Sequence, residues 1–173
     1  MGSNPIVLTN FASNPNGEGT VGYAVSYIEY INMNTCDKGV LGEAKTIARL
    51  VELGYGVFLP LSGHAPFDII AVSKIDNKTI RISCKACYSS NKNGSFDFSL
   101  RQITPNTKGC NIKLFDTMDC DLIACYIAPL DKVCFVNSKD IESKSTITFR
   151  EVESKFSNTG KSRVISNYLI PTI

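Results

Sequence analysis

Two charged residues, Asp68 and Lys85, stand at the ends of two short apolar segments, where a carboxylate and an ammonium group could act together. Asp68 precedes the apolar run Ile69–Val72, and Lys85 closes the segment Arg81–Lys85 after a turn at Asp76-Asn77. If the two segments pair as neighbouring strands, both charged groups reach the same end of a sheet. Charged groups at such an edge rarely serve packing alone, so the pair predicts a functional site.

Alternation along the second segment shows which residues share a face. One face receives Ile80, Ile82 and Cys84, and the other receives Arg81, Ser83 and Lys85. The polar face is expected to meet the same cleft as Asp68, because side chains two residues apart point the same way.

This arrangement suits metal-assisted hydrolysis of a phosphodiester. A divalent cation could bind Asp68 and the backbone carbonyl of Cys84, with water completing an oxygen-rich shell, and Mg²⁺ (or Mn²⁺) is the expected ion. Lys85 would stand beside the metal-bound water. There it could orient or help deprotonate the nucleophile and stabilise charge growing on the phosphate.

An amphipathic helix is predicted just upstream, over residues 39–54. Its apolar positions 40, 44, 47, 48 and 51 follow helical spacing, and Gly54 closes it. Glu43 lies at the rim of this stripe, so it could point inward toward a metal. Residues 55–60 then predict a strand.

The order of these elements resembles the PD-(D/E)XK nuclease superfamily. The matching segments are Gly42-Glu43, Phe58-Leu59-Pro60, Phe67-Asp68-Ile69-Ile70 and Ile82-Ser83-Cys84-Lys85. They are most similar to homing endonucleases encoded by group I introns in bacterial tRNA genes, and archaeal Holliday-junction resolvases share the core. The resemblance covers roughly residues 38–136, with later strands at 119–126 and 133–136.

The resemblance implies an α/β fold with a mixed central sheet flanked by helices, and magnesium-dependent, site-specific cleavage of double-stranded DNA. It makes Asp68 the metal ligand, Glu43 a second acid acting directly or through water, and Lys85 the catalytic lysine. Ser83 occupies the third position, where the family has an acid or, in the intron branch, glutamine. Cutting both strands usually requires two active sites, so a homodimer or homotetramer is expected.

Three alternatives stay open at this point. The same core could form a structure-selective nuclease of the Holliday-junction-resolvase kind. Because the neutral hydroxyl of Ser83 is a weak partner for magnesium, the chain could instead be a non-catalytic DNA-binding module. Finally, Asp68 could merely cap a turn while Lys85 is a solvated strand end.

Basic residues are concentrated between positions 81 and 113, although the net charge of the whole chain is only +2. Such a stretch could contact successive phosphates of a nucleic-acid backbone. The predicted DNA-contacting residues are Arg81, Lys92, Arg101, Gln102, Lys108 and Lys113. A solvated polar loop explains the same charges equally well.

His64, in the loop before Asp68, could touch the scissile phosphate, but a lone loop histidine is more often merely exposed.

The chain has seven cysteines, an odd number, and several lie in apolar segments, so reduced core thiols are expected. Cys84 and Cys87 have the spacing of a zinc or redox pair, with Cys110 and Cys120 as conceivable partners. The alternation that puts Cys84 on the apolar face argues against that alternative.

The length predicts one domain with an adequate core. Residues 1–32 differ in composition and are interpreted as an N-terminal extension, with Met33 as a candidate natural start and a single nuclease domain over 33–173. A hairpin is predicted from 121–128 and 133–136, and a short strand at 146–149. No segment suggests a membrane span or signal peptide, so a cytoplasmic protein is expected, associated with the nucleoid when bound to DNA.

Overall fold

The structure is a computed structural model that describes residues 33–62, 65–106, 109–153 and 163–172. The helical elements are α1 (Thr35–Glu52) and the 3-10 turns η1 (Ala128–Leu130), η2 (Ser138–Asp140) and η3 (Ile165–Tyr168). The strands are β1 (Tyr55–Phe58), β2 (Ile69–Ser73), β3 (Thr79–Cys87), β4 (Ser95–Ser99), β5 (Gln102–Asn106), β6 (Gly109–Lys113), β7 (Leu122–Ile127), β8 (Lys132–Asn137), β9 (Thr146–Arg150) and β10 (Arg163–Val164).

A five-stranded mixed sheet forms the middle layer, in the order β1-β2-β3-β7-β8. Strands β3 and β7 are parallel, and the other neighbours in this sheet are antiparallel. The predicted strands around Asp68 and Lys85 are confirmed, and Asn77 takes a left-handed conformation (φ 57°) in the turn between them. All six residues of β7 are buried, because this strand is covered on both faces.

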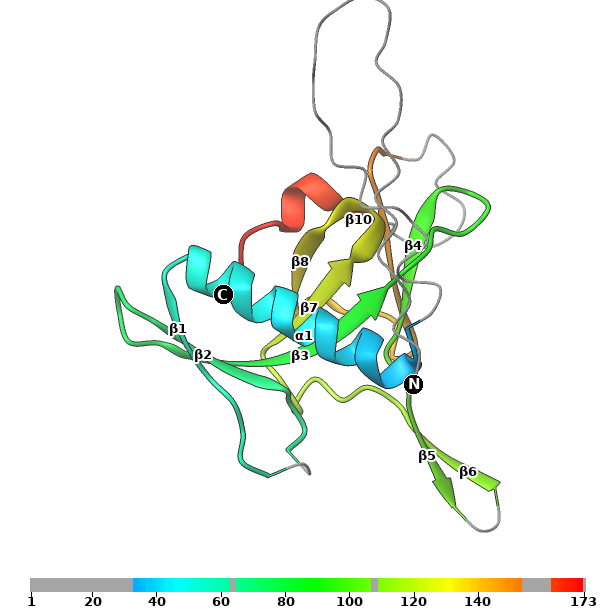
Figure 1. Cartoon of the computed structure of the whole chain (residues 1–173), viewed down its shortest axis with the longest axis horizontal. Helices are drawn as coiled ribbons and strands as arrows, with labels where there is room; N and C mark the ends of the chain where they lie inside the picture. Colours follow the sequence, from blue (N-terminus) through cyan, green and yellow to red (C-terminus); the bar gives the residue numbers. More distant parts are fainter. Residues whose placement is uncertain (1–32, 63–64, 107–108, 154–162, 173) are drawn as a thin grey trace, which may run out of the picture.

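Helix α1 covers one face of the sheet (Figure 1), but not with the predicted stripe. Its buried residues are Gly42, Thr46 and Leu50, whereas Val40 and Val51 are 63% and 56% exposed. Of the five predicted apolar positions, Ile47 packs against the core and the other four are exposed, so the predicted face is correct only at Ile47. The reason is a close approach of helix and sheet: a Cβ on Gly42 would lie 2.8 Å from the Cβ of Ala86, so small residues of α1 face β3.

The opposite face of the central sheet is covered by a second, three-stranded sheet in the order β10-β9-β4. Phe96 and Phe98 of β4 and Phe149 of β9 pack against Ile123 and Ile127 of β7. The expected α/β class with a mixed sheet is confirmed. In the described residues, however, one α-helix covers one face and this second sheet takes the place of a second helical layer.

The segment from Ser95 to Lys113 is not the polar loop that was considered from the sequence. It forms β4 and then a two-stranded ribbon of β5 and β6 (Figure 1). Strand β4 pairs with β9, which lies about fifty residues later in the chain, so local sequence carries little of this information.

All seven cysteines are free thiols, as expected, and Cys120, Cys125 and Cys134 are buried. Cys84 and Cys87 lie three residues apart on β3 and therefore on opposite faces of it. Within the described ranges, no group of three or more His, Cys, Asp or Glu side chains is arranged to hold a metal. Among the helices that the structure describes, none has the length and apolar character needed to cross a membrane.

Candidate active site at the open edge of strand β3

Asp68 is fixed at the start of β2 by three hydrogen bonds to β3. Its backbone N–H donates to the Ile82 carbonyl (2.9 Å). Its Oδ2 accepts from the Cys84 backbone N–H (2.6 Å) and from the Ser83 hydroxyl (3.2 Å). Among the described residues, Oδ1 accepts no hydrogen bond, so this oxygen is available to a cation.

The edge of β3 beside Asp68 is open, because β2 pairs only with residues 79–82 of β3. Beyond Ile82, β3 continues to Cys87, and among the described strands only β7 pairs with it there. The N–H and C=O of one residue in a strand point to the same side. Since the Cys84 N–H points to Asp68, the Cys84 carbonyl lies on this same open edge, as the predicted ligand set requires.

Glu43 and Lys85 join Asp68 electrostatically. Partial burial and then the negative charge of Asp68 raise the pKa of the Glu43 carboxyl, and Lys85 opposes this shift. The pKa of the Cys84 thiol is raised by burial, and Asp68, Glu43 and Lys85 all act on it. The structure therefore brings together the helix acid, the strand acid and the strand lysine that the sequence predicted. None of the described residues forms an ion pair with Glu43 or Lys85.

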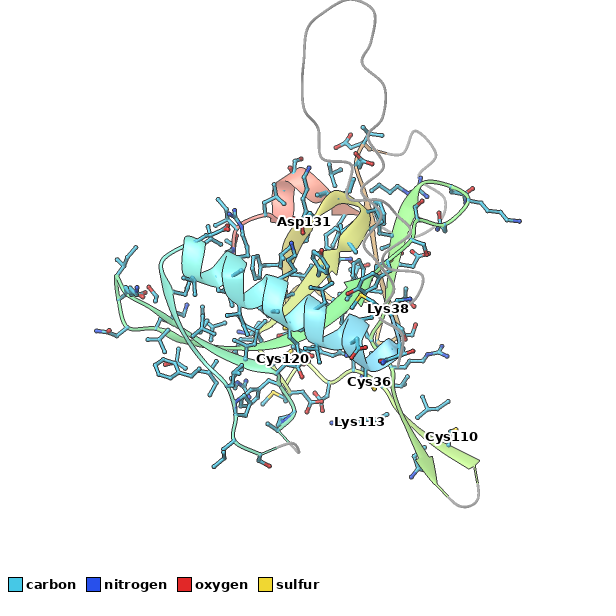
Figure 2. All side chains as sticks on the ribbon, in the orientation of Figure 1. Cys36, Lys38, Cys110, Lys113, Cys120 and Asp131 are labelled. Atoms are coloured by element: carbon cyan, nitrogen blue, oxygen red, sulfur yellow. The ribbon has the colours of Figure 1, made fainter. Side chains whose placement is uncertain are left out.

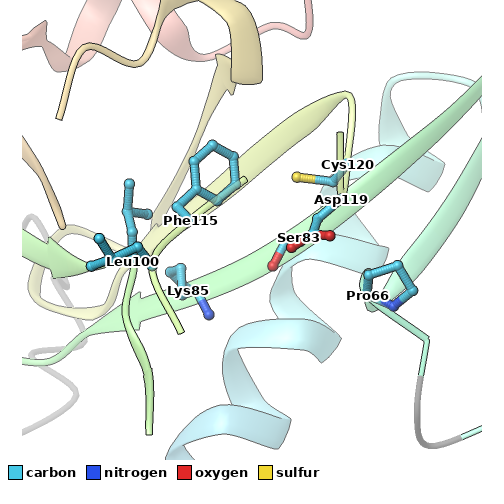
Figure 3. A pocket seen from close by; sticks show the side chains of 8 residues that line it. Pro66, Ser83, Lys85, Leu100, Phe115, Asp119 and Cys120 are labelled. Atoms are coloured by element: carbon cyan, nitrogen blue, oxygen red, sulfur yellow. The ribbon is translucent and has the colours of Figure 1, made fainter. Parts of the chain in front are cut away.

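Ser83 and Lys85 line a small pocket next to this edge (Figure 3). Its other lining residues are Pro66, Leu100, Leu114, Phe115, Asp119 and Cys120. Ser83 is only 8% exposed, and its hydroxyl donates to Asp68, so it orients that carboxylate without adding charge.

Asp119 is a pocket residue that sequence reasoning missed. Its carboxylate accepts from Lys113 Nζ at 2.7 Å, and this contact raises the pKa of Lys113. The sequence did place Asp119 just before a predicted strand. Only the parallel pairing of that strand, β7, with β3 brings Asp119 beside Ser83.

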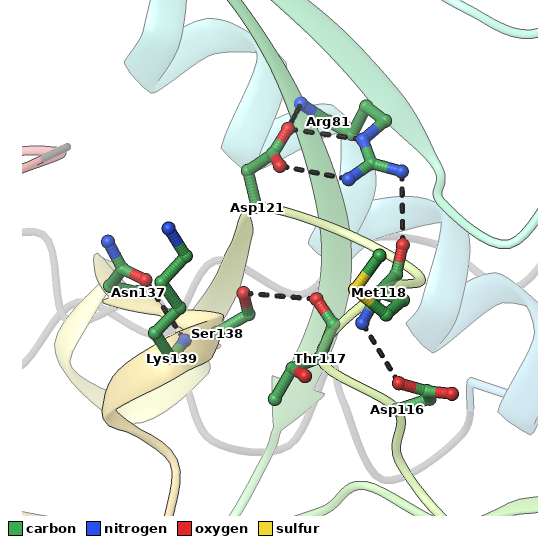
Figure 4. Close-up of polar contacts among 8 residues, drawn as sticks. All are labelled: Arg81, Asp116, Thr117, Met118, Asp121, Asn137, Ser138 and Lys139. Carbon is green, nitrogen blue, oxygen red and sulfur yellow. Dashed lines mark hydrogen bonds and ion pairs between the residues drawn. The ribbon is translucent and has the colours of Figure 1, made fainter.

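Of the predicted DNA-contacting residues, Arg81 is the one whose side-chain contacts within the described residues are most extensive. The Arg81 guanidinium is held by both carboxylate oxygens of Asp121 (2.9 and 3.2 Å) and by the Met118 carbonyl (3.1 Å), as Figure 4 shows. This contact lowers the pKa of Asp121. Lys92 and Arg101 are exposed. His64, Lys108 and the side chain of Gln102 lie outside the described residues. For all of them, contact with DNA stays a prediction.

The donors at the open edge fit a small hard cation. All the candidate ligand atoms are oxygens, from the Asp68 and Glu43 carboxylates and the Cys84 carbonyl. The two carboxylates repel each other, and a bound cation would reduce this repulsion. Mg²⁺ is commonly bound through one or two carboxylates and several waters. The residues present therefore fit magnesium, with fewer charges than a three-acid site would offer.

The mixed sheet with its acids and lysine at an open strand edge defines a restriction-endonuclease-like α/β domain. The family model described as PD-(D/E)XK endonuclease matches residues 33–170, and the chain belongs to this family. The solved structure of a bacterial homing endonuclease, I-Ssp6803I, is similar in fold. It has 18% sequence identity, a TM-score of 0.62, and an alignment covering 79% of this chain and 88% of that one. No curated protein matches the sequence.

Proposed function

We propose that this protein is a magnesium-dependent, site-specific endonuclease that hydrolyses phosphodiester bonds of duplex DNA. The observation that carries the proposal is the meeting of Asp68, Glu43 and Lys85 at the open edge of β3. Membership of the PD-(D/E)XK endonuclease family and the fold of a homing endonuclease support it.

In this proposal, Asp68 and the Cys84 carbonyl hold Mg²⁺ or Mn²⁺, and Glu43 contributes directly or through a water. The bound ion supplies charge neutralisation and a more acidic water. Lys85 would orient the attacking water, or help to remove its proton, and would stabilise charge growing on the phosphate. Ser83 keeps the Asp68 carboxylate in position through its hydroxyl.

The decisive test is cleavage by the Lys85→Ala variant. Duplex DNA that carries intronless tRNA genes is incubated with the native chain, with magnesium or with chelator. We expect discrete, magnesium-dependent cuts whose rate falls at least about 100-fold in the variant, because general acid–base and charge-stabilising roles have that size. Lys74→Ala is the matched control, since Lys74 is exposed in the turn after β2, and it should cut at the native rate.

A second candidate, a non-catalytic DNA-binding module, is favoured by one observation, the neutral Ser83 beside Asp68. If the native chain and Lys85→Ala both bind duplex DNA and neither cuts it, the endonuclease proposal fails and this candidate replaces it.

A further inference from the structure

The ribbon of β5 and β6 stands away from the two larger sheets (Figure 1). Each of its strands pairs only with the other. All five residues of β6 are exposed, and Figure 2 shows Cys110 out on the ribbon, beyond the body of the domain. An isolated two-stranded hairpin is marginally stable in water, so its presence here calls for a role outside the core.

The base of the ribbon is fixed beside the candidate active site. Leu100, just before β5, and Leu114 and Phe115, just after β6, line the same pocket as Ser83 and Lys85. The N–H of Leu100 donates to the Ser145 carbonyl (2.9 Å), and the N–H of Phe115 donates to the Lys144 carbonyl (3.2 Å). Lys113 pairs with Asp119 in the pocket wall. A partner bound by the ribbon is therefore held at a defined position relative to Lys85.

The register of the ribbon separates polar from apolar positions. Residues directly opposite each other share a face. One face carries the pairs Gln102–Lys113, Thr104–Asn111 and Asn106–Gly109, and the other carries Ile103–Ile112 and Pro105–Cys110. The segment 98–115 contains no aspartate or glutamate. The first of these faces, the polar face, presents Asn111 and Lys113 from β6, and the Lys113 ammonium is paired with Asp119 at the base of the ribbon.

We propose that this ribbon enters the major groove of duplex DNA and that its polar face, with Asn111 at its centre, reads base edges next to the scissile phosphate. The major groove admits a two-stranded β-ribbon, and asparagine and glutamine side chains recognise adenine by paired hydrogen bonds. The inference rests on the proposed function of the neighbouring site, and it names the element that selects the target.

Selection of duplexes from a randomised library tests this inference through binding, without cleavage. Lys85→Ala serves as the parent, and Asn111→Ala and Cys110→Ala are added to it separately. Cys110→Ala is the matched control, because Cys110 is exposed, adjacent in β6, and on the opposite face of the ribbon. Both added substitutions lie on exposed positions, so unchanged thermal melting verifies that each chain is folded.

We expect the parent to enrich a defined sequence, and Asn111→Ala to lose roughly tenfold of the preference at one or two base pairs, the usual worth of one good base contact. Cys110→Ala should keep the parental preference. Replacing the affected adenines by 7-deazaadenine should weaken binding of the parent but not of Asn111→Ala.

Two results overturn the ribbon inference: a sequence preference that Asn111→Ala leaves unchanged at every position, and binding of duplex DNA with no preference at all. The first result leaves discrete, magnesium-dependent cleavage by the native chain intact if the proposed function is right. The second result also contradicts the site specificity of that function, and the cleavage assay then shows whether a non-specific nuclease activity remains. A third outcome is a sequence preference that depends on Asn111 in a protein whose native chain cuts no DNA. This outcome supports the ribbon inference and rejects the endonuclease proposal.

Discussion

Ser83 occupies the position beside Asp68 at which a third charge would complete the acid set. It is buried, and its hydroxyl donates to the Asp68 carboxylate at 3.2 Å. A glutamate there would repel Asp68 and Glu43 when no cation is present, and it would give a bound cation a further charged ligand.

We therefore expect Ser83→Glu to melt at a lower temperature than Ser83→Gln in chelator. Added magnesium should raise the melting temperature of Ser83→Glu by more than that of Ser83→Gln. The half-saturating magnesium concentration should fall about tenfold, on the order of 1.4 kcal/mol of binding. Thermal melting across a magnesium titration measures both effects. Because Ser83→Gln has a similar size without the charge, equal magnesium dependence of the two variants would contradict this ligand role.

Glu43 predicts a pH dependence of stability in the absence of metal. Because burial and Asp68 raise its folded-state pKa, the folded protein holds this proton more tightly than the unfolded chain does. The free energy of unfolding therefore declines as the pH rises from the unfolded pKa, near 4.5, through the raised pKa, and it stays lower above it.

Glu43→Gln removes this decline and makes the protein slightly more stable at pH 7 in chelator, by less than about 1 kcal/mol because the carboxylate is partly solvated. The variant should also lose stabilisation by magnesium. Urea unfolding at several pH values, with Glu52→Gln as an exposed control, provides the measurement. If Glu43→Gln kept the native dependence of the free energy of unfolding on pH, Glu43 would not be the group whose ionisation destabilises the fold.

At the scale of elements, the approach of α1 to β3 decides where Glu43 lies. Gly42 lets the helix sit against Ala86, and the buried Thr46 hydroxyl donates to the Gly42 carbonyl at 2.9 Å. A side chain larger than hydrogen at position 42 would push the helix, and with it Glu43, away from the open edge.

Gly42→Ala is therefore expected to cost about 1–3 kcal/mol through overpacking and to reduce cleavage. Gly39→Ala is the matched control, since a Cβ at Gly39 has nothing within 4 Å. It should stabilise the same helix by up to about 1 kcal/mol through better helix propensity. Chemical denaturation of both variants compares the two effects, and equal stabilisation by both would refute the close-contact argument.

For the whole molecule, cutting both strands of one duplex at a fixed target usually takes two active sites. The chain contains one set of Glu43, Asp68 and Lys85. We expect multi-angle light scattering to give the mass of a homodimer or homotetramer in the presence of DNA, compared with 18.9 kDa for one chain. A monomeric mass under these conditions would limit the protein to nicking one strand at a time.

The sequence by itself determined the local parts of the site. Three short-range patterns were sufficient to predict that the strands carrying Asp68 and Lys85 are neighbours: the alternation over residues 80–85, the turn at Asp76-Asn77 and the apolar run after Asp68. The resemblance carried by these segments also predicted the family that was then confirmed.

Only the tertiary structure decided which face of α1 is buried, because a helix contact made through Gly42 and Thr46 does not follow the hydrophobic pattern. It likewise decided the pairing of β4 with β9 and the approach of Asp119 to Ser83. These features depend on contacts between residues far apart in the chain. Such contacts stabilise the protein only after the intervening segments have folded.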